Sequence, residues 1–190
     1  DEERAMEFIE SALGGNYLGI GDYRQLFYSI RGVLVQLAEE AQLVQDNDIM
    51  HFSAYLSHEE MTQGLLETCQ KLCAVFIERK EKQSDALNQK ILQYIHENFR
   101  DASIYGKSVA ALFGMKEKYL YGFFKEHNDV SLSTYLERLR LEQAAKLLTR
   151  TNDGINEIAE QIGYNSSNTF YKAFLRFYGV SPSDYRDRNC

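Results

Sequence analysis

Apolar residues recur at the three- and four-residue spacing of amphipathic helices along most of this chain, and no stretch alternates apolar and polar positions as a strand would. Before a charged stretch near the middle, the pattern predicts helices over about 2–13, 22–45 and 58–80. Leu, Ala, Glu, Gln and Lys are frequent, and Pro182 is the only proline, which also favours helix. The sequence therefore predicts an all-α protein.

The charged stretch ERKEKQSD, residues 78–85, predicts a boundary between two regions. We expect one helix to end near residue 80 and Ser84 to cap the next, since apolar residues follow Ser84 at helical spacing. Charge divides at the same place: residues 1–82 hold 7 Lys and Arg against 15 Asp and Glu, whereas residues 83–190 hold 14 against 13. This asymmetry predicts two parts with different partners.

The second region repeats itself. VAALFG at 109–114 aligns with IAEQIG at 158–163 at an offset of 49 residues. FFKEHNDVSLSTY at 123–135 aligns with AFLRFYGVSPSDY at 173–185 at an offset of 50 residues. A repeat of this length indicates one supersecondary unit that is used twice.

Each copy has the pattern of a helix-turn-helix motif, near 104–126 and 155–178. In the second copy Gly163 supplies the backbone freedom to end a short helix, and Asn165 or Ser166 can cap the next one. A pair of short helices with a tight glycine turn typically places its second helix in the DNA major groove. Residues 131–150 form a long amphipathic pattern between the copies and predict a rigid connecting helix.

The second helix of each copy has a buried and an exposed side in this pattern. The residues expected to be buried in the two copies, first helices included, are Val109, Ala110, Leu112, Phe113, Leu120, Phe123 and Phe124, and then Ile155, Ile158, Ala159, Ile162, Phe170, Ala173, Phe174 and Phe177. The residues expected on the outward sides are Glu117, Lys118, Tyr121, Gly122 and Lys125, and then Ser167, Asn168, Tyr171, Lys172 and Leu175.

The polar run from Asn165 to Thr169 suits the first turn of a recognition helix, because short side chains allow close approach to bases and phosphates. Asn pairs with an adenine edge and Ser serves as donor or acceptor. Taken alone, the run is better explained as a helix cap with spare polar surface, and only the repeat reverses that judgement. The low net charge of residues 83–190 and the missing side chain at Gly122 keep an alternative open, a helical protein-interaction module whose motif pair has lost DNA binding.

Catalysis, cofactors and metals find no support in the sequence. Its four histidines are scattered, with no ligand spacing to cysteine or carboxylate. Cys69 and Cys73 stand among apolar residues and are predicted to be buried thiols. The loop GGNYLGIG at 14–21 lacks a phosphate-binding motif and is predicted to be a connector. We therefore expect no enzyme activity, no cofactor and no metal site.

These motifs resemble the AraC/XylS transcription regulators over residues 84–188. INEIAEQIGYNSSNTFYKAFLRFYGVSPSDYR, 155–186, is similar to the family signature, and SVAALFGMKEKYLYGFFKEH fits more loosely. The resemblance implies two helix-turn-helix motifs joined by a long helix, which insert two recognition helices into successive major grooves of double-stranded DNA at promoters. The DNA-binding residues expected by position and charge are Lys116, Lys118, Tyr121, Gly122, Lys125, Ser166, Ser167, Asn168, Tyr171, Lys172 and Arg176.

Two departures from the family pattern affect the first motif. Gly122 stands where relatives often have a longer polar or basic residue, so base reading by the first motif is expected either to be weak or to depend on Lys118 and Tyr121. Asp129 replaces the glycine that the second copy keeps as Gly179, and we expect the turn to survive because Asp tolerates the left-handed backbone.

Residues 1–82 lack the pattern of a sugar-binding β-barrel. Their order before the DNA-binding region resembles YesN-like response regulators and the membrane-anchored sensor-regulators of Gram-positive bacteria, which implies an upstream sensor or receiver module. The chain begins DEERAMEF, without Met, as a piece of a longer protein would. We expect signal transmission or homodimerisation through 22–45 or 58–80, a cytoplasmic location that includes the cytoplasmic part of a membrane-anchored protein, and RNA polymerase as a further partner.

Overall fold

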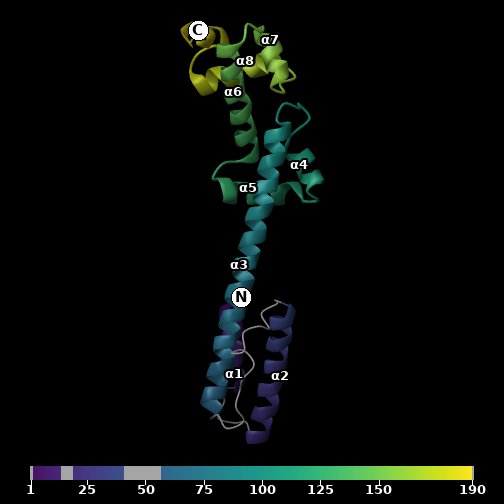
Figure 1. Cartoon of the computed structure of the whole chain (residues 1–190), viewed down its shortest axis with the longest axis vertical. Helices are drawn as coiled ribbons and strands as arrows, with labels where there is room; N and C mark the ends of the chain where they lie inside the picture. Colours follow the sequence, from purple (N-terminus) through teal and green to yellow (C-terminus); the bar gives the residue numbers. More distant parts are fainter. Residues whose placement is uncertain (1, 14–18, 41–56, 190) are drawn as a thin grey trace. The chain divides into compact units, whose positions relative to one another are not determined.

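The computed structural model describes residues 2–13, 19–40 and 57–189, and within them it has only helices and turns (Figure 1). The helices are α1 (Glu2–Leu13), α2 (Ile20–Glu40), α3 (His58–Asn98), α4 (Gly106–Leu112), α5 (Glu117–Asn128), α6 (Leu132–Arg150), α7 (Ile155–Gln161), α8 (Ser167–Tyr178) and α9 (Pro182–Asn189). The all-α prediction is confirmed. None of these helices is long and apolar enough to cross a membrane.

The structure divides into two compact units, residues 1–83 and 84–190. The predicted helix end near residue 80 and the predicted cap at Ser84 are wrong, because α3 continues without a break to Asn98. The charged stretch contains neither Gly nor Pro, and Lys82 pairs with Glu78 one turn earlier at 2.6 Å, so the helix is locally supported there. The Ser84 hydroxyl instead shares a 2.8 Å hydrogen bond with the His127 ring.

The first unit packs α1, α2 and the first part of α3 around an apolar core. Phe27 and Leu65 are fully buried in it, and the Tyr23 hydroxyl donates a 2.6 Å hydrogen bond to the His58 carbonyl oxygen. Cys69 is buried and Cys73 half-buried, both as free thiols, and burial raises the pKa of Cys69, with the neighbouring thiol adding to the rise. Parts of two predictions, the connector over 14–18 and the helix over 41–45, lie outside the described residues.

The second unit contains the predicted repeat. α4 and α5 pack with the end of α3 around one core, and α7 and α8 pack with α6 around another. α6 runs from the first motif to the second (Figure 1). The fully buried side chains of the two cores are Ile91, Ile95, Val109, Leu120, Phe124 and Leu132 in one, and Leu141, Ala144, Leu148, Ile158, Ala159, Ile162, Phe170 and Phe174 in the other.

The turns of the repeat have matching backbone conformations. Gly114 and Gly163, between the helices of each motif, have φ of 64° and 85°. Asp129 and Gly179, which follow α5 and α8, have φ of 59° and 75°. The expectation that Asp129 adopts the left-handed conformation of its glycine counterpart is therefore confirmed, as is the arrangement of two helix-turn-helix motifs joined by a long helix.

Two apolar residues predicted to be buried are exposed instead. Leu112 is 58% exposed and Phe177 is 46% exposed. Each lies in the last turn of its helix, α4 or α8. Periodicity assigns these residues to the apolar face, but it carries no information on whether another element still covers that face at the helix end.

Candidate nucleic-acid interface

The N-terminus of α8 is built from the tight turn that precedes it. The Tyr164 N–H donates to the Ala159 carbonyl oxygen at 2.9 Å, which folds the chain back on α7. Ser166 is the N-cap, and its hydroxyl accepts from the Thr169 N–H at 3.4 Å. The predicted cap is thus confirmed, and it gives this helix a defined, solvent-facing start.

The outward side of α8 gathers most of the residues predicted for the second motif. Asn168, Tyr171 and Lys172 are exposed, as is the capping Ser166, while Ser167 is half-buried. The opposite side of the helix is the buried one, with the side chains Phe170, Ala173 and Phe174. The short polar and basic groups therefore lie together on one accessible face.

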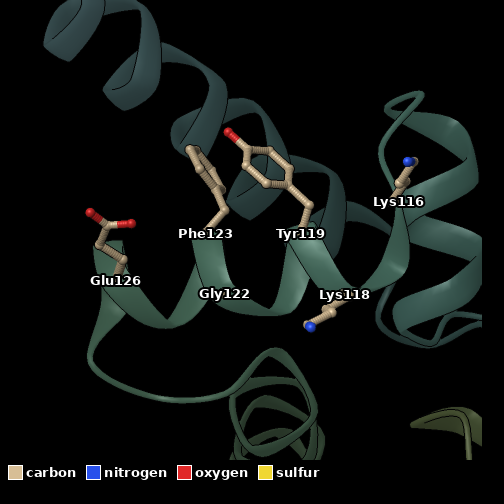
Figure 2. A pocket seen from close by; sticks show the side chains of 6 residues that line it. All are labelled: Lys116, Lys118, Tyr119, Gly122, Phe123 and Glu126. Carbon is tan, nitrogen blue, oxygen red and sulfur yellow. The ribbon is translucent and has the colours of Figure 1, made fainter.

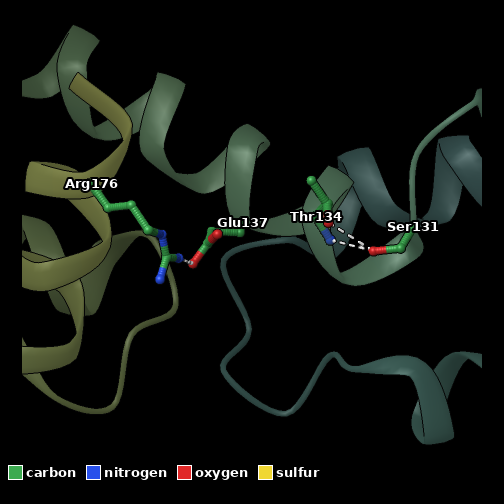
Figure 3. Close-up of polar contacts among 4 residues, drawn as sticks. All are labelled: Ser131, Thr134, Glu137 and Arg176. Atoms are coloured by element: carbon green, nitrogen blue, oxygen red, sulfur yellow. Dashed lines mark hydrogen bonds and ion pairs between the residues drawn. The ribbon is translucent and has the colours of Figure 1, made fainter. Parts of the chain in front are cut away.

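Arg176, predicted to bind DNA, is engaged within the protein. Its Nη2 donates to the Glu137 carboxylate of α6 at 2.6 Å, and both side chains remain open to solvent (Figure 3). α6 begins beside this pair with Ser131 as its N-cap, whose hydroxyl accepts from the Thr134 N–H at 3.1 Å. A phosphate would have to compete with the Glu137 carboxylate for this guanidinium.

The outward side of α5 carries cations around a hollow. Lys116 is the N-cap with an extended backbone, and Lys118 and Lys125 are exposed. Gly122 lies in the middle of this side (Figure 2). The hollow, about 470 Å³, is lined by Lys116, Lys118, Tyr119, Gly122, Phe123 and Glu126.

Tyr119 is a candidate residue that sequence reasoning missed. The residue is 61% exposed, and its ring lies near that of Phe123, with the ring centroids 6.1 Å apart. Tyr121 was expected on the outward side, but it is half-buried and packs with the core of the first motif. A Cβ added to Gly106 of α4 would overlap the Tyr121 hydroxyl, so the ring occupies the space that this glycine leaves. The structure thus places Tyr121 in the contact between α4 and α5.

One turn connects the two motifs. Arg140 of α6 donates from Nε to the Phe99 carbonyl oxygen at 2.7 Å and from Nη2 to the Asp101 carbonyl oxygen at 2.8 Å. The same turn abuts the second motif, where a Cβ on Gly163 would lie 2.7 Å from the Arg100 carbonyl oxygen. The turn after α3 is therefore held between α6 and the turn of the second motif, and its contacts help to set where the motifs lie relative to each other.

Tyr164 packs beside this connection as a neutral side chain. Burial raises the pKa of Tyr164 to about 12, and the Glu137 carboxylate adds to the rise, so the hydroxyl stays neutral at physiological pH. The Arg140 guanidinium lies over the Tyr164 ring at 6.0 Å from its centroid. Arg140 joins residues about forty positions away, and helical periodicity contains no signal for such a contact.

A polar contact also fixes the C-terminal end of α5 to α3. Asn88 is buried, and the Asn128 amide donates to its Oδ1 at 2.9 Å while the Asn88 amide donates in return at 3.4 Å. The Asn128 amide also donates to the Phe124 carbonyl oxygen at 2.9 Å. Because a buried amide without partners is costly, this pair favours one placement of α5 on α3.

The chemistry of these surfaces is that of recognition. In the part of the chain that the structure describes, no group of three or more His, Cys, Asp or Glu side chains could hold a metal ion. What the second unit offers is two exposed helix faces, one with short polar groups beside a lysine and one with three lysines. Such groups suit contacts with phosphates and base edges.

Comparison with known proteins agrees with this geometry. Residues 109–188 match the family described as "Helix-turn-helix domain". The raffinose operon transcriptional regulatory protein RafR of Pediococcus pentosaceus is 36% identical over 107 residues, which are 56% of this chain and 38% of RafR. The chain therefore spans well under two thirds of the length of this relative.

Two solved structures share the fold of the second unit. The C-terminal domain of the two-component response regulator YesN from Fusobacterium nucleatum is 29% identical, and the match covers 53% of this chain and 98% of that domain with a TM-score of 0.53. The C-terminal domain of AraT, a response regulator from Geobacillus stearothermophilus, is 35% identical, with 53% and 84% covered and a TM-score of 0.52.

Proposed function

The chain belongs to the AraC/XylS family of transcription regulators, and from this premise we propose that it binds double-stranded DNA in a sequence-dependent way and thereby regulates transcription. α5 and α8 are the helices that enter the major groove. The residues of their outward faces, described above, make the contacts to bases and phosphates.

The observation that carries the proposal is the placement of two recognition helices around one connecting helix. α6 has 19 residues, which corresponds to a length of about 28 Å at the helical rise. Successive major grooves on one side of a duplex are ~34 Å apart. A connection of this length supports simultaneous entry of α5 and α8 into neighbouring grooves from one copy of the chain.

Base reading is assigned first to α8. Asn168 lies in the first turn of the helix and is exposed, and Lys172 follows one turn later on the same side. An asparagine amide matches an adenine edge, whereas lysine serves guanine or a phosphate. The free N–H groups at the capped start of α8 add a favourable field for one backbone phosphate.

The test is selection of bound duplexes from a random library by the full chain, followed by a salt titration on the enriched sequence. We expect enrichment of a defined sequence and an affinity that falls steeply with salt, because lysines displace condensed counterions. Absence of enrichment at low salt would contradict the proposal and favour an interaction module without DNA binding.

We propose in addition that the first unit forms a homodimer and relays a signal. Phe8, Val33 and Phe76 are large, exposed apolar residues beside an apolar hollow of about 320 Å³ in this unit, and such a surface is typical of an interface. Val33→Glu should shift the sedimentation coefficient of a dimeric chain to that of a monomer. A coefficient that is monomeric before the substitution would contradict dimerisation.

Partners outside this chain are proposed on coarser grounds. The two solved relatives are C-terminal domains of response regulators, which supports an upstream sensor or receiver module joined to the first unit. RNA polymerase is the further partner that promoter regulation implies. A pull-down of purified polymerase by the duplex-bound chain tests this contact, and equal recovery with the duplex alone would contradict it.

A further inference from the structure

We propose that the two motifs divide their work: α8 reads base sequence, whereas α5 holds the neighbouring groove through its lysines without reading sequence. The inference rests on the DNA binding proposed above and assigns different roles within it. It follows from a comparison of equivalent positions in the two copies of the repeat.

Three outward positions of the recognition helices correspond at an offset of 50 residues. In α8 they are Asn168, Tyr171 and Lys172, and all three side chains are exposed. In α5 they are Lys118, the half-buried Tyr121, and Gly122, which has no side chain. Only one of the three α5 positions therefore presents a polar group outward.

Tyr121 and Tyr171 differ in exposure for a steric reason, which lies at the start of the preceding helix. α4 begins with Gly106, and the Tyr121 ring fills the space where a Cβ would stand. α7 begins at the equivalent position with Ile155, whose side chain packs against the core of the second motif. Tyr171 is left 43% exposed. Tyr121 thus packs between α4 and α5, whereas Tyr171 is accessible for contact with DNA.

The groups that remain on α5 suit phosphates. Lys116, Lys118 and Lys125 are exposed, and none of them forms an ion pair with another residue in the described ranges. A lysine ammonium is a flexible point charge that a phosphate satisfies readily, and without the planar fork of arginine it discriminates base edges less strongly. Phosphate contacts position a protein on the duplex but carry no sequence information.

The hollow at Gly122 makes the inference testable. A Cβ added there meets no other atom within 4 Å, and the residue is not among the glycines with positive φ. A Cβ therefore fits at this position without displacing another atom, and Gly122 lies in the middle of α5 beside the hollow (Figure 2). The wild-type helix lacks a reading group at this position, and a substitution supplies one.

The experiment uses the full chain in selection from a random duplex library, with hydroxyl-radical footprinting on the enriched duplex. The expected result is one conserved block of sequence, with protection that extends over the next ~10 base pairs, where sequence is unconstrained. Two conserved blocks about one helical turn apart would overturn the division of work and leave the proposed DNA binding intact. Failure to enrich any duplex would overturn both.

A gain of specificity provides the second arm. Gly122→Gln should add a second conserved block about one turn from the first, because glutamine can pair with an adenine edge. Gly32→Gln is the matched control, since Gly32 is also an exposed helical glycine with open space around it but lies in α2 of the first unit. If Gly122→Gln selects the same single block as this control, α5 does not face the bases and the inference fails.

Discussion

Substitution of the turn glycine in the second motif should destabilise the protein more than substitution of its counterpart in the first. Gly163 and Gly114 both have positive φ. Alanine at either position is destabilised by the left-handed conformation by roughly 1–2 kcal/mol. Their surroundings differ. A Cβ on Gly163 would lie 2.7 Å from the Arg100 carbonyl oxygen and 2.9 Å from that of Phe99, whereas a Cβ on Gly114 meets nothing within 4 Å.

The difference between the two variants isolates the close approach of the backbones. The atoms that a Cβ at Gly163 would meet are backbone atoms, which cannot rotate away as a side chain can. Forcing extra volume into a packed site typically costs about 1–3 kcal/mol beyond other effects. We therefore expect Gly163→Ala to lower the free energy of unfolding by about 2–5 kcal/mol, against about 1–2 kcal/mol for Gly114→Ala.

Urea unfolding of the full chain by far-ultraviolet circular dichroism measures both losses. Hydrogen exchange of peptides from 155–178 and 104–126 then assigns each loss to its motif. A second control is Gly179→Ala, which combines positive φ with open space and should resemble Gly114→Ala. Equal losses for Gly163→Ala and Gly114→Ala, within about 0.5 kcal/mol, would refute the argument from the close approach.

Three further substitutions test separate contacts. Asn168→Ala should cost ~1–3 kcal/mol of discrimination at one base position, and an unchanged preference across a duplex library would count against its role. Lys125→Ala should weaken binding to all duplexes alike and reduce the salt slope by about 1, as expected for a phosphate contact; a sequence-dependent loss would contradict this. Asn88→Ala should lower the free energy of unfolding by ~1–3 kcal/mol, because Asn128 loses its partner on α3. Denaturant unfolding checks it, and a loss as large in the Asn128→Ala background as in the wild type would exclude the pairing.

Local features of the fold could be predicted from the sequence with good accuracy. The helix over 2–13, the two helix-turn-helix motifs and the cap at Ser166 all depend on neighbours within about one helical turn. The left-handed turn at Asp129 was expected from its repeat partner Gly179. The repeat also carried the functional inference, because two copies of a motif are far more specific than one.

Tertiary structure decided where local pattern was ambiguous. The charged stretch at 78–85 is compatible with a boundary or with a continuous helix, and α3 continues because no residue there breaks it. Ser84 is a residue type that commonly caps helices. Its hydroxyl instead forms a hydrogen bond with the ring of His127, 43 positions away. Exposure at the ends of α4 and α8 likewise depends on which element covers a face.

The same distinction applies to the candidate DNA-binding surface. Sequence determined that α5 and α8 carry polar and basic groups on one side and buried phenylalanines on the other, since helical spacing alone sorts them. Only the folded chain decided that Tyr121 fills the space beside Gly106, that Glu137 holds Arg176, and that Arg140 joins α6 to the turn after α3. The last two contacts link residues about forty positions apart, and the first depends on a missing side chain in another helix. Periodicity determines the side of a helix on which a residue lies, whereas packing determines what that residue meets there.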